Sequence, residues 1–259
     1  MPATTPFRSH KLHRAVAGVL AASLALGLSG CNEAEQGGAA AAATGQPVAN
    51  IAAPSGQQWR DVAAITEEGG YLIGNPAAPI KLVEYGSLTC PACAAFSQAA
   101  KTPLEENYVD SGRVSFELRS FLIHGPVDLA LTRMVECGDP AAIHPRANQI
   151  WANLDSILNK VQAATPQLEA AMQLPPNQRF VAFADAAGLY DFFAERGLGE
   201  AQARACLADT AALERLANNS QQFSEDGVTG TPTFFLNGQK LDANGWPAVE
   251  QALQAAGAR

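Results

Sequence analysis

The pattern of apolar and polar positions predicts strands alternating with helices in the first part of a folded domain. Residues 70–74 predict a short edge strand, and residues 80–85 form an apolar run typical of a buried strand. A helix is expected from Ala94, with a kink or restart at residues 102–105, where Thr-Pro-Leu-Glu resembles a capping box. Residues 114–118 alternate apolar and polar and predict a third strand.

Strand signals are absent from about residue 127 to residue 216, whereas helical stretches recur. Helices are expected over residues 129–136, 147–161, 166–172, 179–186 and 200–207. Residues 231–236 are strand-like again, Asn237-Gly238 predicts a turn into residues 239–241, and an amphipathic helix is expected around residues 246–256. We therefore predict a helical subdomain, about 127–216, inserted between strands of an α/β domain that spans residues 59–259.

The start of the chain predicts an export signal over residues 1–30. Three basic residues precede an apolar stretch from 15 to 28, which is long enough for a signal core and too short to span a bilayer. The stretch ends in Leu-Ser-Gly-Cys31, which resembles the lipobox of bacterial lipoproteins and implies that Cys31 is acylated. The alternative is a soluble secreted protein that is cut nearby, with Cys31 as an incidental residue.

Composition changes after the signal. Residues 31–58 are rich in Ala, Gly, Gln and Pro and show no apolar period, so we predict a disordered tether. Without the signal, the 17 Lys and Arg residues fall to 14 against 25 Asp and Glu, a net charge of −11. Such an acidic chain is a poor candidate for binding nucleic acid or anionic lipid head groups.

The candidate chemistry lies in Cys90-Pro91-Ala92-Cys93, between the strand at residues 80–85 and the following helix. The first cysteine would occupy the opening turn of the helix, where free N–H groups and the helix dipole favour a thiolate. The second, one turn further on, could attack a mixed disulfide on the first. The spacing therefore predicts a thiol-disulfide oxidoreductase whose redox centre is the Cys90–Cys93 pair, with no other cofactor.

A C-x-x-C pair can also supply half of a zinc site. The other cysteines are Cys31, Cys137 and Cys206, with no second C-x-x-C, so a four-ligand site would need Cys137 and Cys206 to converge on the pair. We predict no metal site. His124 and His144 have no acidic or cysteine partner at ligand spacing and are assigned no chemistry.

With these motifs in place, the order of elements resembles the thioredoxin-fold proteins of the DsbA type, from Gly70 to the C-terminus. Gly230-Thr231-Pro232-Thr233 looks like the cis-proline loop of that family, which lies beside the active-site disulfide. The resemblance implies that Thr231 and Pro232 form the edge on which an extended peptide substrate docks. The alternative is a trans proline that opens a strand.

The resemblance also implies a role for Glu84, which lies six residues before Cys90, where the family carries a buried acid. A buried carboxylate would have a raised pKa and could accept the Cys93 proton through water. Strand alternation alone leaves open whether Glu84 points inward or to solvent. The Pro-Ala dipeptide lacks the histidine of the best-known oxidase, so we expect a less depressed Cys90 pKa and a weaker oxidant.

Cys137 and Cys206 are expected to form a second, structural disulfide, as in some DsbA-like proteins, worth about 4 kcal/mol. The leading hypothesis is a lipid-anchored thiol-disulfide oxidoreductase of the bacterial periplasm that donates disulfides to exported proteins and works with a membrane redox partner. Asn32 after the lipid cysteine favours the outer membrane. The alternatives are a reductase or isomerase fed by a membrane electron donor, and a non-catalytic thioredoxin-fold chaperone.

Overall fold

The computed structural model describes residues 45–259, and the predicted signal peptide, Cys31 and tether residues 32–44 lie outside the described residues. Within residues 45–259, six strands form one mixed sheet in the order β1-β2-β4-β3-β5-β6. The strands are β1 (Ala63–Ile65), β2 (Tyr71–Gly74), β3 (Ile80–Gly86), β4 (Val114–Ser120), β5 (Thr233–Leu236) and β6 (Gln239–Lys240). The central pair, β3 and β4, is parallel, and the other neighbouring pairs are antiparallel. The predicted α/β class is confirmed.

The expectation that residues 70–74 form an edge strand is wrong. The antiparallel partner β1 covers the outer side of β2, with Ala64 opposite Leu72. Only three residues make up β1, and its Ala-Ala-Ile sequence is too short to show an alternating pattern.

The predicted helices are present in the expected order, together with two that were not predicted, at residues 189–194 and 210–225. They are α1 (Pro91–Pro103), α2 (Pro126–Val135), α3 (Ile143–Ala152), α4 (Leu154–Ala163), α5 (Thr165–Ala171), α6 (Pro176–Ala186), α7 (Leu189–Ala194), α8 (Glu200–Ala208), α9 (Thr210–Glu225) and α10 (Trp246–Ala255), with short helical turns η1 (Trp59–Asp61), η2 (Leu104–Val109) and η3 (Pro140–Ala142). The single helix expected over residues 147–161 is interrupted at Asn153. The helical insertion extends past residue 216, because α9 continues to Glu225.

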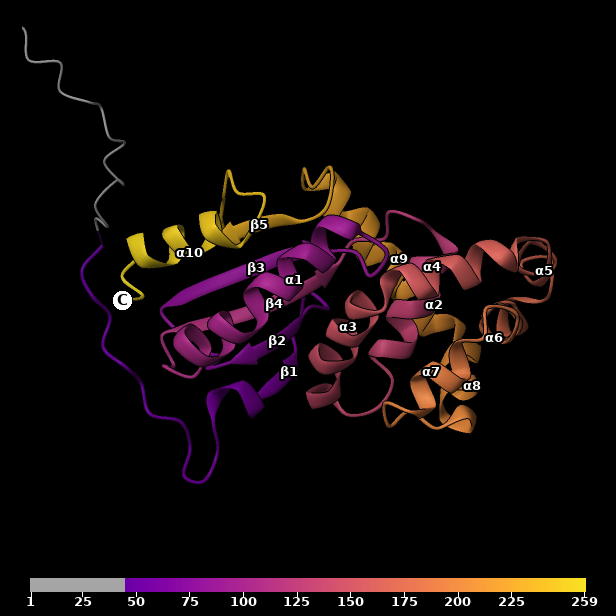
Figure 1. Ribbon diagram of the computed structural model, residues 1–259, viewed down its shortest axis with the longest axis horizontal. Helices are drawn as coiled ribbons and strands as arrows, with labels where there is room; N and C mark the ends of the chain where they lie inside the picture. The colour runs from indigo at the N-terminus through magenta and orange to yellow at the C-terminus, as the bar shows by residue number, and fades with distance from the viewer. Residues whose placement is uncertain (1–44) are drawn as a thin grey trace, which may run out of the picture. The chain divides into compact units, whose positions relative to one another are not determined.

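One face of the sheet carries most of the apolar side chains of the central strands. Ile80 and Leu82 of β3 point to this face and are buried against α1 and α10. The rings of Phe96 in α1 and Phe234 in β5 lie with centroids 4.5 Å apart, which links the helix to the sheet. Figure 1 shows α1 and α3 lying over this face and α10 along its β5 side. Full burial of each such side chain contributes roughly 1.5–3 kcal/mol.

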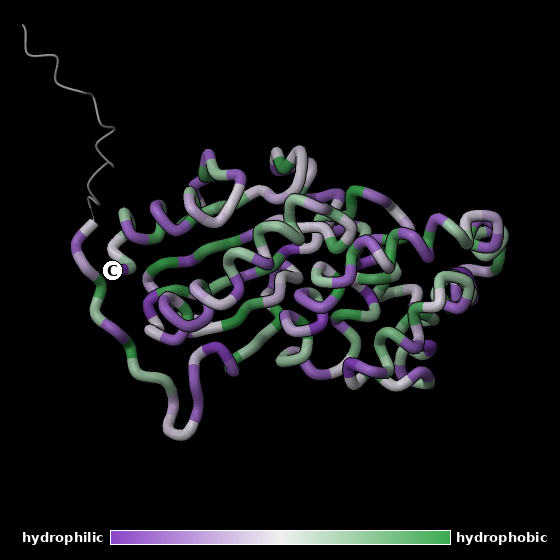
Figure 2. The backbone as a smooth tube through the Cα atoms, viewed as in Figure 1, coloured by the Kyte–Doolittle hydropathy of each residue, from purple (hydrophilic) through white to green (hydrophobic). Residues whose placement is uncertain are grey.

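The helices α2 to α8 enclose a second apolar cluster beyond the end of the sheet. Leu131 and Met134 of α2 and Phe193 of α7 are completely buried in it. Cys90 and Cys93 belong to this cluster through the start of α1, so the helical part closes over the strand-to-helix junction. Figure 2 shows hydrophobic residues along the central strands and hydrophobic alternating with hydrophilic residues along these helices.

Residues 45–58, the end of the predicted tether, contact the folded domain at several positions. The backbone N–H groups of Gly45 and Val48 donate to carbonyl oxygens at and just after the end of α10, at 2.8 and 2.9 Å. Further along, Trp59 Nε1 donates to the carbonyl of Ile51 at 2.7 Å. Val48 and Ala53 also pack against the apolar cluster beside α1 and α10, although the segment shows no apolar periodicity.

Candidate active site

The Cys90-Pro91-Ala92-Cys93 motif lies where β3 passes into α1, as the sequence predicts. Cys90 is the N-cap residue of α1 with extended backbone angles, and Pro91 takes the first helical position, where its missing N–H leaves no helical bond unmade. The backbone N–H of Cys93 donates to Cys90 Sγ at 3.4 Å. Within the described range, the two thiols are free and both residues are buried.

The proline loop lies directly beside Cys90. Strand β5 runs antiparallel to β3 with Thr233 opposite Tyr85, which brings the residues before β5 next to the residues after β3. The Thr231–Pro232 peptide bond is cis, and Cys90 Sγ lies 3.4 Å from the carbonyl oxygen of Thr231. The proline loop and the cysteine pair therefore lie side by side, as the resemblance implies. The alternative of a trans proline is excluded.

The surroundings of Cys90 favour its thiolate. The hydrogen bond from the Cys93 side chain is the largest influence, and the Thr231 side chain and the backbone N–H groups of Cys93 and Ala92 act in the same direction. Against the opposing effect of burial, they lower the pKa of Cys90 to about 5. A thiol with this pKa is almost fully ionised at neutral pH and is a good leaving group in disulfide exchange.

Cys93 and Glu84 lie beneath Cys90 and are held in their protonated forms. The hydrogen bond to Cys90, burial and the Glu84 charge all raise the pKa of Cys93 above its ordinary range. Glu84 points to the covered face of the sheet and is 1% exposed. Burial, followed by the charge of Cys90, raises the pKa of Glu84 to about 8, although the nearby Cys93 thiol opposes this.

The Glu84 carboxyl borders a small cavity between the sheet, α1 and α3. Neither carboxyl oxygen has a hydrogen-bond partner among residues 45–259. The cavity has a volume of about 20 Å³, and its polar lining includes Ser97, Asn148, His144, Lys101 and Glu105. A volume above roughly 10–15 Å³ can hold one water molecule when polar partners are present. The site therefore has room for a water that could carry a proton to or from Glu84.

A buried polar cluster supports the loop that leads to Cys90, and sequence reasoning missed it. Asp128 at the start of α2 is completely buried, and its Oδ1 accepts hydrogen bonds from Ser87 Oγ at 2.8 Å and Thr89 Oγ1 at 2.9 Å. His124 Nδ1 lies 2.6 Å from the same Thr89 hydroxyl. The sequence signal was available, since Asp128 follows His124 by four residues at a helix start, but the Thr89 contact depends on strand pairing.

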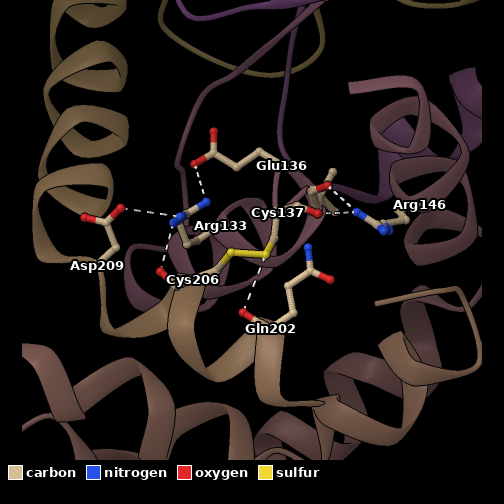
Figure 3. The surroundings of a disulfide bond; sticks show 8 residues. Arg133, Glu136, Cys137, Arg146, Gln202, Cys206 and Asp209 are labelled. Atoms are coloured by element: carbon tan, nitrogen blue, oxygen red, sulfur yellow. Dashed lines mark hydrogen bonds and ion pairs between the residues drawn. A yellow bond between two sulfur atoms is a disulfide. The ribbon is translucent and has the colours of Figure 1, made fainter. Parts of the chain in front are cut away.

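The second disulfide joins Cys137, just after α2, to Cys206 in α8, with the Cα atoms 6.1 Å apart. Figure 3 shows Arg133 beside it, donating to the Cys206 carbonyl at 2.9 Å and to Glu136 at 3.0 Å. Arg146 donates to the Cys137 carbonyl at 2.7 Å from the other side. Because Cys137 and Cys206 are bonded to each other, they do not converge on the C-x-x-C pair as a four-cysteine zinc site would require.

Among residues 45–259, no group of three or more His, Cys, Asp and Glu side chains is arranged to hold a metal ion. In the same part of the chain, no helix is long and apolar enough to cross a membrane.

Residues 66–255 match the family model described as Thioredoxin, which is most of the chain. The chain belongs to the thioredoxin family. Curated relatives of this thioredoxin-family chain include proteins from Rickettsia bellii and Rickettsia prowazekii, each named "Putative protein-disulfide oxidoreductase", which are 24% and 23% identical over 194 residues. The matches cover 73% of this chain and 65% and 62% of the relatives, so the chain spans less than two thirds of their length.

Solved structures confirm the thioredoxin-like fold with its helical insertion. A protein-disulfide isomerase from Novosphingobium aromaticivorans superposes with a TM-score of 0.65 at 26% identity, covering 71% of this thioredoxin-family chain and 95% of that one. The α-DsbA1 protein of Wolbachia pipientis superposes with a TM-score of 0.52 at 21% identity, covering 66% and 76% of the two chains. The similarity to the Wolbachia pipientis protein supports the fold alone.

Proposed function

We propose that this protein is a thiol-disulfide oxidoreductase of the bacterial cell envelope that donates disulfides to exported proteins. The observation that carries the proposal is the position of Cys90, whose pKa is about 5, beside the Thr231–Pro232 loop and above a buried carboxyl group. The names of the relatives support the same reaction class.

The reaction starts from the oxidised pair. A substrate thiolate attacks Cys90 Sγ, the Cys90–Cys93 bond breaks, and Cys93 leaves as a thiolate that takes a proton. A second substrate thiolate then attacks the substrate sulfur of the mixed disulfide, and Cys90 leaves as a thiolate that its surroundings stabilise. The substrate loses two electrons and two protons in total, and the Cys90–Cys93 pair gains the electrons. Thr231 and Pro232 would hold the substrate backbone beside Cys90.

Glu84 would exchange the proton with Cys93. Its raised pKa, about 8, means that it is protonated at neutral pH and can give a proton to the leaving Cys93 thiolate. When the pair is oxidised again, Glu84 can take the proton back. The cavity beside Glu84 provides space for the water through which this proton would move.

Oxidation of the reduced pair would pass two electrons to a redox partner in the membrane. The predicted lipid on Cys31 would keep the protein at a membrane surface facing the periplasm. Asn32 after the lipid cysteine favours the outer membrane. Labelling with a radioactive fatty acid tests the anchor: the full chain should incorporate label, and Cys31→Ala should not. Label retained in Cys31→Ala would remove the anchor from the proposal.

A second candidate activity is disulfide isomerisation or reduction. The printed name of the Novosphingobium aromaticivorans neighbour, a protein-disulfide isomerase, is the observation that favours it. Refolding of a substrate with scrambled disulfides separates the two: an isomerase should restore activity without net oxidation, whereas a disulfide donor should act on fully reduced substrate.

The main test mixes oxidised protein with a reduced, unfolded substrate protein and counts thiols on both. Wild type should transfer one disulfide per molecule, whereas Cys90→Ser and Cys93→Ser, neither of which can form the Cys90–Cys93 disulfide, should transfer none. Gln98→Ala, an exposed change on α1, is the matched control and should behave as wild type. Full function in Cys90→Ser would favour the third reading, a chaperone whose C-x-x-C is structural.

A further inference from the structure

Three strands bring loops to the same edge of the sheet as Cys90. Strand β3 leads to Cys90, and β4 runs parallel to it with Gly86 opposite Ser120, so both chains leave the sheet at the same edge. After the strands end, the two chains stay together: the N–H of Phe121 donates to the carbonyl of Gly86 at 2.8 Å. Since β5 lies on the other side of β3, Cys90 has the Thr231–Pro232 loop on one flank and residues 121–125 on the other.

The loop on this second flank is fixed at successive residues. The N–H of Leu122 donates to Ser220 Oγ at 2.9 Å, and the N–H of His124 donates to Asp128 Oδ2 at 2.8 Å. Gly125 adopts a positive φ of 52°, which favours glycine, and its carbonyl accepts the bond from Leu129 that starts α2. His124 is exposed even though its backbone is held in this way.

The hydrogen bonds also define which ring nitrogen of His124 carries a proton. The Thr89 hydroxyl has one hydrogen, and it donates this hydrogen to Asp128 Oδ1 at 2.9 Å. At 2.6 Å from His124 Nδ1, the Thr89 oxygen must therefore accept, so Nδ1 bears the proton. In the neutral ring, Nε2 keeps its lone pair, and no described residue bonds it. An exposed imidazole is thus held in one orientation, with a basic nitrogen free, beside the residue that precedes Cys90.

From this geometry we infer that His124 is the proton acceptor for the incoming substrate thiol, an inference that rests on the proposed function. The substrate S–H bond breaks, its proton moves to His124 Nε2, and the thiolate's electron pair forms the bond to Cys90 Sγ while the Cys90–Cys93 bond breaks. The imidazolium afterwards releases its proton to solvent. A cysteine thiol with a pKa near 8.5 is mostly protonated at neutral pH, so a base at this position accelerates the first attack.

The dipeptide between the two cysteines contains no histidine, and His124 instead lies on the loop after β4, in contact with Thr89, the residue before Cys90. The charged group held in this network is Asp128, and Thr89 and Ser87 are uncharged. Cys90, a titratable neighbour, carries no charge in the oxidised protein that starts the reaction. Glu84, which can give a proton to the leaving Cys93, is present in wild type and in a His124 variant alike, so the ratio of their rates at each pH isolates the contribution of the imidazole.

The test measures the rate at which oxidised protein reacts with a peptide containing one cysteine, from about pH 6 to about pH 9.5. His124→Asn keeps a side-chain N–H for Thr89 and removes Nε2, so it preserves the network. We expect its rate to fall roughly 10- to 100-fold near pH 7 and to equal the wild-type rate near pH 9.5, where the peptide thiol is already ionised. Thionitrobenzoate, an aryl thiol ionised at neutral pH, should react at the same rate with both proteins.

The matched pair at Thr89 provides a second readout. Thr89→Ser keeps the hydroxyl and should retain the wild-type pH profile. Thr89→Val removes the hydrogen-bond partner of the His124 ring and should react more slowly with the peptide than wild type near pH 7. The inference would be overturned if the rate of His124→Asn fell by the same factor at every pH and with both thiols, or if its rate did not fall at all. If wild type itself reacts with neither thiol, the proposed function fails instead, so the two failures are distinguishable. If the asparagine variant does not fold, as judged by thermal unfolding, His124→Gln also removes the imidazole and can be compared with wild type in its place.

Discussion

Replacing Glu84 with Gln removes a buried carboxyl group and keeps the size of the side chain. The Glu84 side chain is 1% exposed and, among residues 45–259, makes no hydrogen bond. Burial is the main reason that its pKa rises from 4.5 to about 8. The folded protein therefore holds the Glu84 proton more tightly than the unfolded chain does, and the carboxylate destabilises the fold whenever it is ionised.

The size of this effect follows from the two pKa values. Each pH unit between them corresponds to about 1.4 kcal/mol, so full ionisation of Glu84 costs about 5 kcal/mol and the cost at pH 7 is about 3 kcal/mol. Because the folded pKa is the higher one, the stability linked to this group is complete below about pH 4.5 and is lost as the pH rises through about 8. Glutamine does not titrate, so the Glu84→Gln variant should not lose this stability as the pH rises.

The assay is chemical denaturation of the reduced proteins at several pH values. Glu84→Gln should match wild type near pH 4.5, exceed it by about 3 kcal/mol at pH 7 and by about 5 kcal/mol above pH 8. The same variant should slow disulfide transfer, since it cannot exchange a proton with Cys93. Glu105→Gln, at the outer rim of the cavity, is the control and should show no such trend. A stability difference that stays constant with pH would refute the reasoning.

Three further predictions concern other parts of the molecule. Alkylation of reduced protein by iodoacetamide should titrate near pH 5, and Cys93→Ala should shift the midpoint upward because Cys93 provides the main hydrogen bond to the Cys90 thiolate. Replacing Cys137 and Cys206 with Ser should lower the free energy of unfolding by about 4 kcal/mol in urea titrations, given their separation of 69 residues. Asp128→Ala leaves buried donors unpaired and should cost about 3 kcal/mol in the same assay; a cost below 1 kcal/mol would contradict the importance of this cluster.

Sequence reasoning succeeded where the signal is local. The apolar run at 80–85 and the alternation at 114–118 predicted the two central strands, and a cysteine pair after the first strand defined the helix start. The strands and the helix start are visible in short stretches of chain, where period and residue type carry the information. The cis-proline loop was expected from the resemblance of Gly-Thr-Pro-Thr to a family motif, and the bond is cis in the structure.

The features that were missed depend on contacts between distant segments. Gly45 and Val48 are bonded to the C-terminal end of the chain and Ile51 to Ser111, and β1 is defined by its pairing with β2. Likewise, His124 gains its partner Thr89 only because β3 and β4 run parallel and end at the same edge. The inward direction of Glu84 could be decided only once the helices showed which face of the sheet is covered.

The most direct test of the central claim is the equilibrium reduction potential of the Cys90/Cys93 pair against glutathione. A Cys90 pKa of about 5 lies between the values near 3.5 and 7 found for DsbA and thioredoxin. We therefore predict a potential between roughly −120 and −230 mV, as befits a protein that gives its disulfide away. A potential of about −270 mV or lower would contradict disulfide donation and identify the pair as a reductant.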